Sequence, residues 1–293
     1  MKTDYILITA ARNEEVYIEK TIQSVISQNI SPKRWVIVSD GSTDRTDEIV
    51  AKYKSKHSFI QLVRNVIRSD RNFASQVNAF NMGYEQVSNL DYDFIGNLDA
   101  DVSFGPNYYE NILLKFARNN KLGIAGGIVF DKRGKKFERQ FISGSVSVCG
   151  PIQMFRRECF EEIGGYVPIE NGPLDVVADL KARMRGWEVK SFPDIKVLHH
   201  RRTGTTRRRI ISYRYYQGIM EYSLGYHPIF EIAKCFLRTF ERPYIIGSLL
   251  RIGGYSWAYF RRFERVMPKD VVEYLRNEQL YRLRQVVGYK RRV

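Results

Sequence analysis

Short hydrophobic runs alternate with segments of helical spacing over residues 1–200. The run YILITAA at residues 5–11 is almost entirely apolar, as expected for a strand buried on both faces of a sheet. Comparable runs predict further strands at residues 35–38, 59–63, 93–98, 123–130 and 195–198. Apolar side chains at helical spacing predict helices over residues 14–28, 73–88, 107–118, 156–162 and 175–185. A further helix is predicted to begin at a cap residue, Thr43 or Asp44, and to end at about residue 54.

Strands and helices that alternate at this spacing predict an α/β fold with a doubly wound, mostly parallel sheet. Right-handed crossovers place the strand-to-helix turns at one edge of such a sheet, and ligands bind at the carboxyl ends of its strands. Polar, acidic segments occupy three of these ends, at residues 11–14, 39–42 and 99–101. We expect one crevice to collect them. Residues 131–148, basic and then rich in Ser and Gly, are interpreted as a connection.

The net charge of +15 is concentrated in the last third of the chain. Residues 1–195 hold 26 Lys and Arg against 25 Asp and Glu, whereas residues 196–293 hold 21 against 7. From residue 210 onward, aromatic and basic residues recur at helical spacing. The sequence therefore predicts a nearly neutral catalytic domain over 1–200 and a basic, aromatic helical extension over 201–293 that faces an anionic surface.

Several classes of protein are disfavoured by what the chain lacks. The three cysteines, Cys149, Cys159 and Cys235, form no CxxC pair, and an odd number cannot all be joined in disulfides. This argues against a disulfide framework or a zinc ribbon and indicates a reducing compartment. The N-terminus enters a strand directly and does not resemble a signal peptide. No GxGxxG follows a strand and no GxxxxGK loop occurs, which disfavours dinucleotide oxidoreductases and P-loop NTPases.

Two carboxylates follow the strand at 93–98. Asp99 and Asp101 are two residues apart in extended chain, so their side chains project to one side. Such hard ligands suit Mg²⁺ or Mn²⁺, whose remaining positions are taken by water and phosphate oxygens. The alternative is a solvated turn. Asp40, after the second strand, is a candidate to accept hydrogen bonds from a nucleobase or ribose, or it is an Asx-turn residue.

Histidines and arginines follow the last predicted strand. His199 and His200 are candidates for a third metal ligand or a diphosphate contact, and imidazole favours Mn²⁺ over Mg²⁺. The alternative for each is a structural histidine. Arg201, Arg202 and the run at 207–209 are interpreted as contacts for phosphates of a donor or of a lipid-linked acceptor, or else as a solvated basic loop.

Four motifs taken together resemble the signatures of family 2 glycosyltransferases with the GT-A fold. They are ITAARNEE at 8–15, VSDGSTD at 38–44, LDAD at 98–101 and PIQMFRRECFEEIGGY at 151–166, and the resemblance covers about residues 4–200. It implies a nucleotide-sugar half over 1–105, an acceptor half over 106–200, and inverting, metal-dependent transfer with UDP as the favoured nucleotide. It also implies that Asp101 ligates the metal and that the nucleotide-sugar site comprises Ala11 and Glu14 beside the base, Asp40 on the base, Asp99 near the ribose, and Ala100.

The family deprotonates its acceptor with an acidic residue, usually in a Glu-Asp pair just before a helix. This chain departs from that pattern, because GPLDVVADL at 172–180 contains no such pair. Asp175 and Asp179 are spaced i and i+4, so they share one helical face and both are candidates. Asp175 lies nearer the start of the helix and is the preferred base. Asp179 is the alternative, or else a residue of the helix surface.

The predicted function is transfer of a sugar to a lipid-linked or polysaccharide-precursor acceptor in cell-surface glycan synthesis. One alternative is a nucleotidyltransferase, but residues 12–15 are a poor match for its Gly-rich, basic phosphate loop. The other is a nucleic-acid-binding protein, which a pI near 9.7 and the cluster Tyr213, Tyr215 and Tyr216 suggest. No recognition motif supports it, so nucleic acid is not expected as a partner.

The extension is predicted to hold the enzyme on the cytoplasmic face of an anionic membrane without crossing it. Between residues 228 and 260 the chain is rich in apolar and aromatic residues, and the basic residues Lys234, Arg238, Arg242 and Arg251 interrupt it. The longest uncharged stretch between residues 228 and 260 is 252–260, which is well short of the roughly 20 residues that span a bilayer. A helix in the headgroup region suits this pattern. The alternative is packing on the catalytic domain or on a second subunit of a homo-oligomer.

Overall fold

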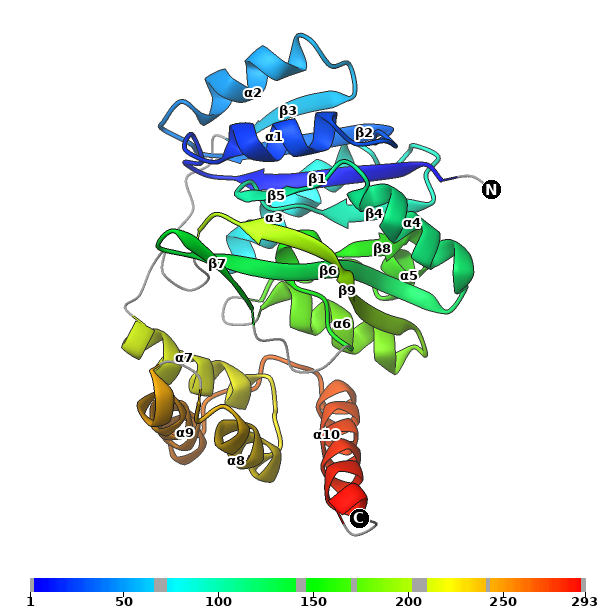
Figure 1. The fold of residues 1–293 in the computed structure, drawn as a ribbon. Helices are drawn as coiled ribbons and strands as arrows, with labels where there is room; N and C mark the ends of the chain where they lie inside the picture. The colour runs from blue at the N-terminus through cyan, green and yellow to red at the C-terminus, as the bar shows by residue number, and fades with distance from the viewer. Residues whose placement is uncertain are drawn as a thin grey trace. The chain divides into compact units, whose positions relative to one another are not determined.

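The chain folds into two compact units, Met1–Arg202 and Thr203–Val293. The computed structural model describes residues 3–65, 73–140, 146–169, 173–201, 210–240 and 243–290. The first unit contains all the strands of these residues, and the second is helical (Figure 1). The three cysteines are free thiols.

A nine-stranded sheet forms the centre of the N-terminal unit (Figure 1). The strands are β1 (Tyr5–Ala11), β2 (Arg34–Asp40), β3 (Ile60–Asn65), β4 (Phe94–Asn97), β5 (Val102–Phe104), β6 (Leu122–Arg133), β7 (Lys136–Arg139), β8 (Met154–Arg156) and β9 (Glu188–His199). Their order is β3-β2-β1-β4-β8-β6-β9-β5, with β7 paired to β6. Because β8 is antiparallel to both β4 and β6, the strands β1 to β4, β6 and β9 all run in one direction. The predicted α/β class with a mostly parallel sheet is confirmed.

Helices cover both faces of this sheet, as the alternation of side chains along a strand requires. Tyr5 and Leu7 of β1 join one core with α1 (Ile18–Ile26), α2 (Thr46–Lys54) and α4 (Tyr108–Arg118). Ile6 and Ile8 join the opposite core with α3 (Phe73–Glu85), α5 (Arg157–Glu162) and α6 (Leu174–Met184). Each fully buried side chain of this size contributes about 1.5–3 kcal/mol relative to exposure, so a change of strand register would be strongly unfavourable.

The sheet extends further along the chain than the hydrophobic runs predict. Residues 131–148 are not simply a connection, since β6 continues to Arg133 and pairs with β7 in a hairpin. The last strand begins at Glu188 rather than at 195, and its pairing with β6 shifts register around Pro193 and Asp194. A bulge accommodates a proline, which has no N–H to donate to the ladder. The helix predicted over 14–28 is shorter, because residues 14–17 form a turn before α1.

The C-terminal unit consists of α7 (Ile210–Ser223), α8 (Pro228–Leu237), α9 (Tyr244–Phe260) and α10 (Lys269–Lys290). Helices α7 and α9 pack backbone against backbone: a Cβ on Gly218 would lie 2.0 Å from the carbonyl oxygen of Arg251, and one on Gly254 equally close to that of Tyr215. Glycine is required at both positions. No helix in the described part of the chain has the length and apolar content that crossing a membrane requires.

Candidate active site

Four strands that run in the same direction end at the same edge of the sheet, and most of the predicted site residues lie there. Ala11 ends β1, Asp40 ends β2, His199 ends β9, and the segment 99–101 follows β4. Ala11 and Ala100 are almost fully buried, so they can contribute to a ligand site mainly through their backbone. The single polar edge expected from the alternation of strands and helices is present.

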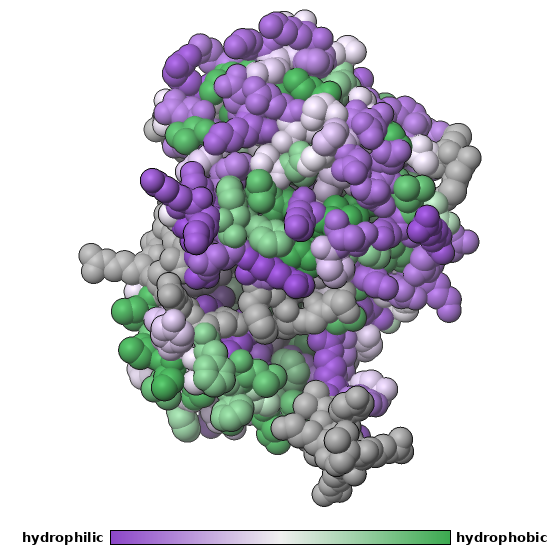
Figure 2. Space-filling model, viewed as in Figure 1, coloured by the Kyte–Doolittle hydropathy of each residue, from purple (hydrophilic) through white to green (hydrophobic). Residues whose placement is uncertain are grey.

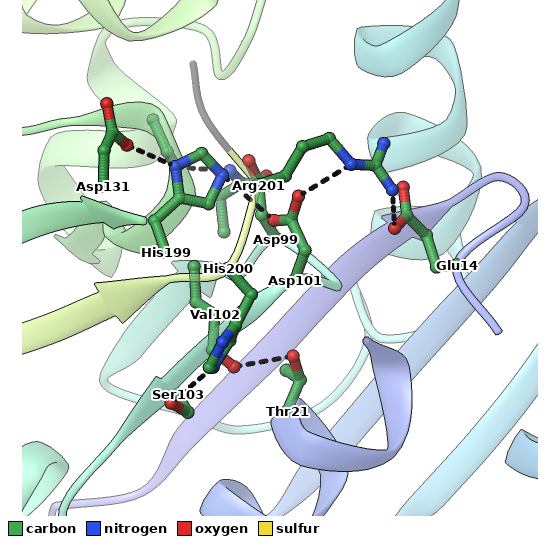
Figure 3. A network of polar contacts seen from close by, with 12 residues as sticks. Glu14, Thr21, Asp99, Asp101, Val102, Ser103, Asp131, His199, His200 and Arg201 are labelled. Carbon is green, nitrogen blue, oxygen red and sulfur yellow. Dashed lines mark hydrogen bonds and ion pairs between the residues drawn. The ribbon is translucent and has the colours of Figure 1, made fainter. Parts of the chain in front are cut away.

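Asp99, Asp101 and His199 form a group that could hold a metal ion, with ligand atoms all within 4.8 Å of one another. Figure 3 shows His199 pointing at Asp101, whose Oδ1 lies 3.2 Å from the histidine Nε2. Asp101 and His199 are both buried, and Asp99 is half-buried. Two carboxylates and one imidazole are a donor set that suits Mn²⁺.

The electrostatics of this group also fit a cation. Burial and the negative charge of Asp101 raise the pKa of Asp99 to about 7, so the two carboxylates do not ionise together easily. Burial lowers the pKa of His199, but its hydrogen bonds to Asp101 and Asp131 outweigh burial and raise that pKa to about 10. Without a metal the histidine is therefore cationic and offsets part of the negative charge of the carboxylates. A divalent ion would supply more positive charge, and the histidine would bind it as a neutral imidazole.

Asp131 is a member of the site that the sequence did not reveal. It is the register partner of His199 across the parallel pair β6–β9, and its Oδ1 lies 2.8 Å from the histidine Nδ1 (Figure 3). A carboxylate on Nδ1 fixes the ring so that Nε2 is left to face a metal. The interpretation of 131–148 as a connection leaves this residue out. The signal that could place it is its position as the first polar residue after the strand predicted at 123–130.

Replacing Asp131 by Asn is expected to weaken Mn²⁺ binding by about 10- to 100-fold. The amide nitrogen can donate to Nδ1, which favours the tautomer whose proton sits on Nε2 and blocks the metal. Electron paramagnetic resonance of free Mn²⁺ measures the affinity directly, and Asp194→Asn, at an exposed ion pair with Lys115, is the matched control. An unchanged affinity in Asp131→Asn, with the fold intact, would remove this role.

His200 does not join the metal group. Successive residues of a strand point to opposite faces, and the His200 Nε2 lies 2.8 Å from the Ser103 hydroxyl while its ring stacks against Tyr17 at 6.3 Å. Its backbone N–H donates to the carbonyl oxygen of Asp101 at 2.8 Å. The described structure therefore brings His199, and not His200, to the carboxylates.

The end of β2 presents Asp40 beside two polar partners. Its Oδ1 accepts a hydrogen bond of 2.8 Å from the Asn65 side chain, and its Oδ2 lies 3.7 Å from Arg12. The loops after β1 and β2 are joined by Asn13, whose Oδ1 accepts from the Thr43 N–H at 2.8 Å. Asn13 has a φ of 56°, a left-handed conformation that asparagine tolerates. The carboxylate is thus held in a fixed position at the edge of the sheet.

Arg201 connects the two acidic parts of this edge. Its guanidinium pairs with the Glu14 carboxylate and lies 3.6 Å from the Asp101 Oδ2 (Figure 3). It also lies 5.3 Å from the centre of the Tyr17 ring. The Glu14 backbone N–H donates to the Thr46 hydroxyl at 2.7 Å. The guanidinium lies beside Asp101, where phosphates of a donor are expected. Arg202 and 207–209 lie outside the described residues.

Asp175, in the first turn of α6, is half-buried near the same edge. Its Oδ2 accepts the Gly150 N–H at 2.9 Å and its Oδ1 accepts the Val176 N–H at 2.9 Å. Burial raises its pKa above the ordinary value despite these hydrogen bonds, and its charge in turn raises the pKa of Asp99. A carboxylate of raised pKa is a better proton acceptor than an ordinary one.

Asp179 lies in the interior instead, with 1% of its surface exposed. Its carboxylate accepts hydrogen bonds from the Ser147 hydroxyl at 2.7 Å, the Val148 N–H at 2.9 Å and the Gln153 side chain at 2.8 Å. Burial raises its pKa to about 7. The helical face shared with Asp175 points it into the core, where it fixes the segment before Gly150.

The comparisons with known proteins agree with this geometry. The model of the family described as glycosyl transferase family 2 matches residues 6–163, more than half of the chain. The protein is a glycosyltransferase and belongs to family 2, as the four motifs indicated. Poly-beta-1,6-N-acetyl-D-glucosamine synthases are 24% identical in Staphylococcus epidermidis and 25% in Staphylococcus aureus strain COL, over 204 residues in each case. These matches cover 64% of this chain but 47% of the relatives, so the chain spans about half their length.

Solved structures confirm the GT-A-type fold. S. aureus TarS 1-349 in complex with UDP-GlcNAc superimposes with a TM-score of 0.57 at 16% identity, covering 75% of this chain and 66% of that one. The mannosyltransferase PcManGT from Pyrobaculum calidifontis, in complex with GDP-Man and Mn²⁺, gives 0.58 at 15% identity and covers 99% and 83%. At such identities the likeness concerns the fold.

Proposed function

We propose that this glycosyltransferase is inverting and metal-dependent, and that it takes its sugar from a UDP-sugar. The observation that carries the proposal is the meeting of Asp99, Asp101 and His199 at the sheet edge that also holds Asp40. Buried carboxylates at this position repel a diphosphate unless a cation lies between them. A Mn²⁺ or Mg²⁺ ion held by these three side chains would offset the charge of the departing nucleoside diphosphate.

Residues of the same edge are assigned to the donor. Asp40, held by Asn65 and Arg12, accepts hydrogen bonds from the base, and Glu14 lies beside it. Asp99 lies on the ribose side of the metal group, and Arg201 turns from Asp101 to the diphosphate when the donor enters. UDP-N-acetylglucosamine is the first donor to examine. The sequence relatives are synthases of an N-acetylglucosamine polymer, and the similar TarS structure is in complex with UDP-GlcNAc.

Asp175 is assigned as the base of the transfer step. It takes the proton of the acceptor hydroxyl as that oxygen forms a bond to the anomeric carbon, and the bond from that carbon to the diphosphate oxygen breaks. Attack opposite the leaving group inverts the configuration. Asp179 cannot take this role without giving up three hydrogen bonds inside the core, so it is assigned to the fold.

The acceptor is proposed to be lipid-linked or a polysaccharide precursor, at the cytoplasmic face of a membrane, in cell-surface glycan synthesis. Two facts support this assignment. The relatives named above make a polysaccharide, and the last third of the chain carries nearly all of the excess positive charge. Anionic lipid headgroups attract such a segment.

A thermal-shift panel of nucleoside diphosphates tests the donor and the metal together. UDP with Mn²⁺ is expected to raise the melting temperature most, because a ligand at about 100 times its Kd adds about 2.7 kcal/mol to the stability. UDP with EDTA should give little shift, and GDP with Mn²⁺ should give less than UDP. A panel in which no nucleotide shifts the melting temperature, or in which EDTA makes no difference, would contradict the proposal.

A further inference from the structure

Helix α8 of the C-terminal unit has its polarity reversed relative to an ordinary surface helix. Ile229, Ile232 and Phe236 recur at helical spacing and are 59–78% exposed. Glu231 and Lys234, on the other side of the helix, are buried. A helix on the surface of a water-soluble domain normally turns its apolar stripe inward and its charges outward. Here the charges face the interior of the unit.

Helix α9 shows the same reversal. Arg251 is 3% exposed, whereas Ile246, Leu249 and Phe260 are 59–79% exposed. Together with Ile229, Ile232 and Phe236 these side chains define the α8–α9 apolar face. In Figure 2, hydrophobic side chains gather over the region that α7, α8 and α9 occupy in Figure 1. Large exposed apolar side chains that gather in one region mark an interaction site.

The buried charges explain how the unit holds together with its apolar side chains outside. Lys234 lies 2.8 Å from Glu221 of α7 and 2.5 Å from Glu231, and Arg251 of α9 lies 3.4 Å from Glu221. This ion-pair cluster joins three helices from within. The close crossing of α7 and α9 at Gly218 and Gly254 adds the small-residue contact by which helices associate in lipid, where no hydrophobic effect drives them together.

Basic residues border the apolar face where α9 ends. Arg261 and Arg262 are exposed directly after Phe260, and Arg261 lies 5.3 Å from the ring of Trp257, itself half exposed. Residues 203–293 carry 18 Lys and Arg against 7 Asp and Glu. A tryptophan beside arginines at the edge of an apolar surface suits the boundary between acyl chains and anionic phosphates.

We propose that the α8–α9 apolar face sits in the headgroup region of an anionic bilayer, with both helices lying in the membrane plane. At 17 residues α9 is about 25 Å long, shorter than the roughly 30 Å hydrocarbon core. The side chains of an in-plane helix reach about 5–10 Å into the boundary. This inference deepens the proposed function by naming the surface that meets the membrane, and it rests on that function only for the reason why a membrane is needed.

Vesicle flotation of the full chain tests the proposal. The wild type is expected to float with phosphatidylcholine vesicles that contain phosphatidylglycerol at low salt, and less with phosphatidylcholine alone. The double variant Phe236→Ser/Phe260→Ser should lose about tenfold or more of its affinity per side chain. Leu114→Ser on α4, also an exposed apolar residue, is the matched control and should float like the wild type.

Brominated lipids add a measure of depth. Bromines near the carbonyl end of the acyl chains should quench Trp257, and Trp257→Phe should abolish that quenching, because Trp35 is buried in the N-terminal unit and Trp187 lies there too. A wild type that ignores anionic vesicles, or a double variant that floats unchanged, overturns the proposal. If light scattering then shows a dimer that the double variant breaks, a second copy covers the face. UDP affinity, measured without vesicles, reports separately on the proposed function.

Discussion

Asp175→Asn is expected to lower kcat by about 10²- to 10⁴-fold while the affinity for the donor stays unchanged. The amide keeps the size of the carboxylate and an acceptor for the Gly150 N–H, but it cannot take a proton from the acceptor hydroxyl. Burial raises the pKa of Asp175, so this base becomes protonated at a higher pH than an ordinary aspartate, whose pKa is about 3.9. On acidification, the activity of the wild type should therefore begin to fall while the pH is still above that value. The variant should lack this acid limb.

The measurement is turnover of donor and acceptor, with donor affinity from calorimetry on the same preparations. Asp270→Asn, which removes an exposed carboxylate from the first turn of α10, is the matched control and should behave like the wild type. Near-normal turnover in Asp175→Asn would assign the base elsewhere.

A companion change separates the two aspartates of α6. Asp179→Ala leaves the Ser147, Val148 and Gln153 donors without their acceptor, and unmet buried groups cost about 1–3 kcal/mol each in the free energy of unfolding. Chemical denaturation should therefore show the main effect. A stable Asp179→Ala that has lost turnover would reverse the assignment of the two residues.

Asp101→Ala is expected to abolish the enhancement of UDP binding by Mn²⁺. The change removes a metal ligand itself. Loss of a residue that only hydrogen-bonds to a ligand lowers metal affinity by about 10- to 100-fold, so loss of the ligand should lower it by at least about 100-fold. Arg201 and His199 each lose one carboxylate contact, but they keep Glu14 and Asp131, and neither supplies the carboxylate that the cation has lost. Calorimetric titrations of UDP in Mn²⁺ and in EDTA measure the difference.

Asp194→Ala serves as the control, since it removes a carboxylate whose ion pair with Lys115 lies at the surface. In that variant Mn²⁺ should enhance UDP binding as in the wild type. Retained enhancement in Asp101→Ala would place the metal at other residues.

The fold and the polar edge of the sheet could be predicted because they depend on local pattern. A buried parallel strand must be apolar along its length, and the first polar residues after it must lie at the ligand-binding edge. Residues 40 and 99–101 follow from this rule alone. The resemblance of the four motifs added the enzyme class, which the family match confirms.

Residues whose placement depends on pairing between distant strands could not be predicted in the same way. Asp131 directly follows the hydrophobic run at 123–130, but only its register with His199 shows that the two residues meet. The spacing of Asp175 and Asp179 indicates a shared helical face but not which end of that face lies near the polar edge of the sheet. The same limit applies to His200, because two adjacent histidines in a sequence do not indicate which of them faces the carboxylates.

The location of the metal in a nucleotide complex tests the account most directly. Crystals of the protein with UDP and Mn²⁺, measured at the manganese absorption edge, would show the ion by its anomalous scattering. The account predicts one peak among the carboxylates of Asp99 and Asp101 and the Nε2 of His199, with the diphosphate against it and the uracil at Asp40. A peak elsewhere, or UDP bound at this edge without manganese, would contradict it.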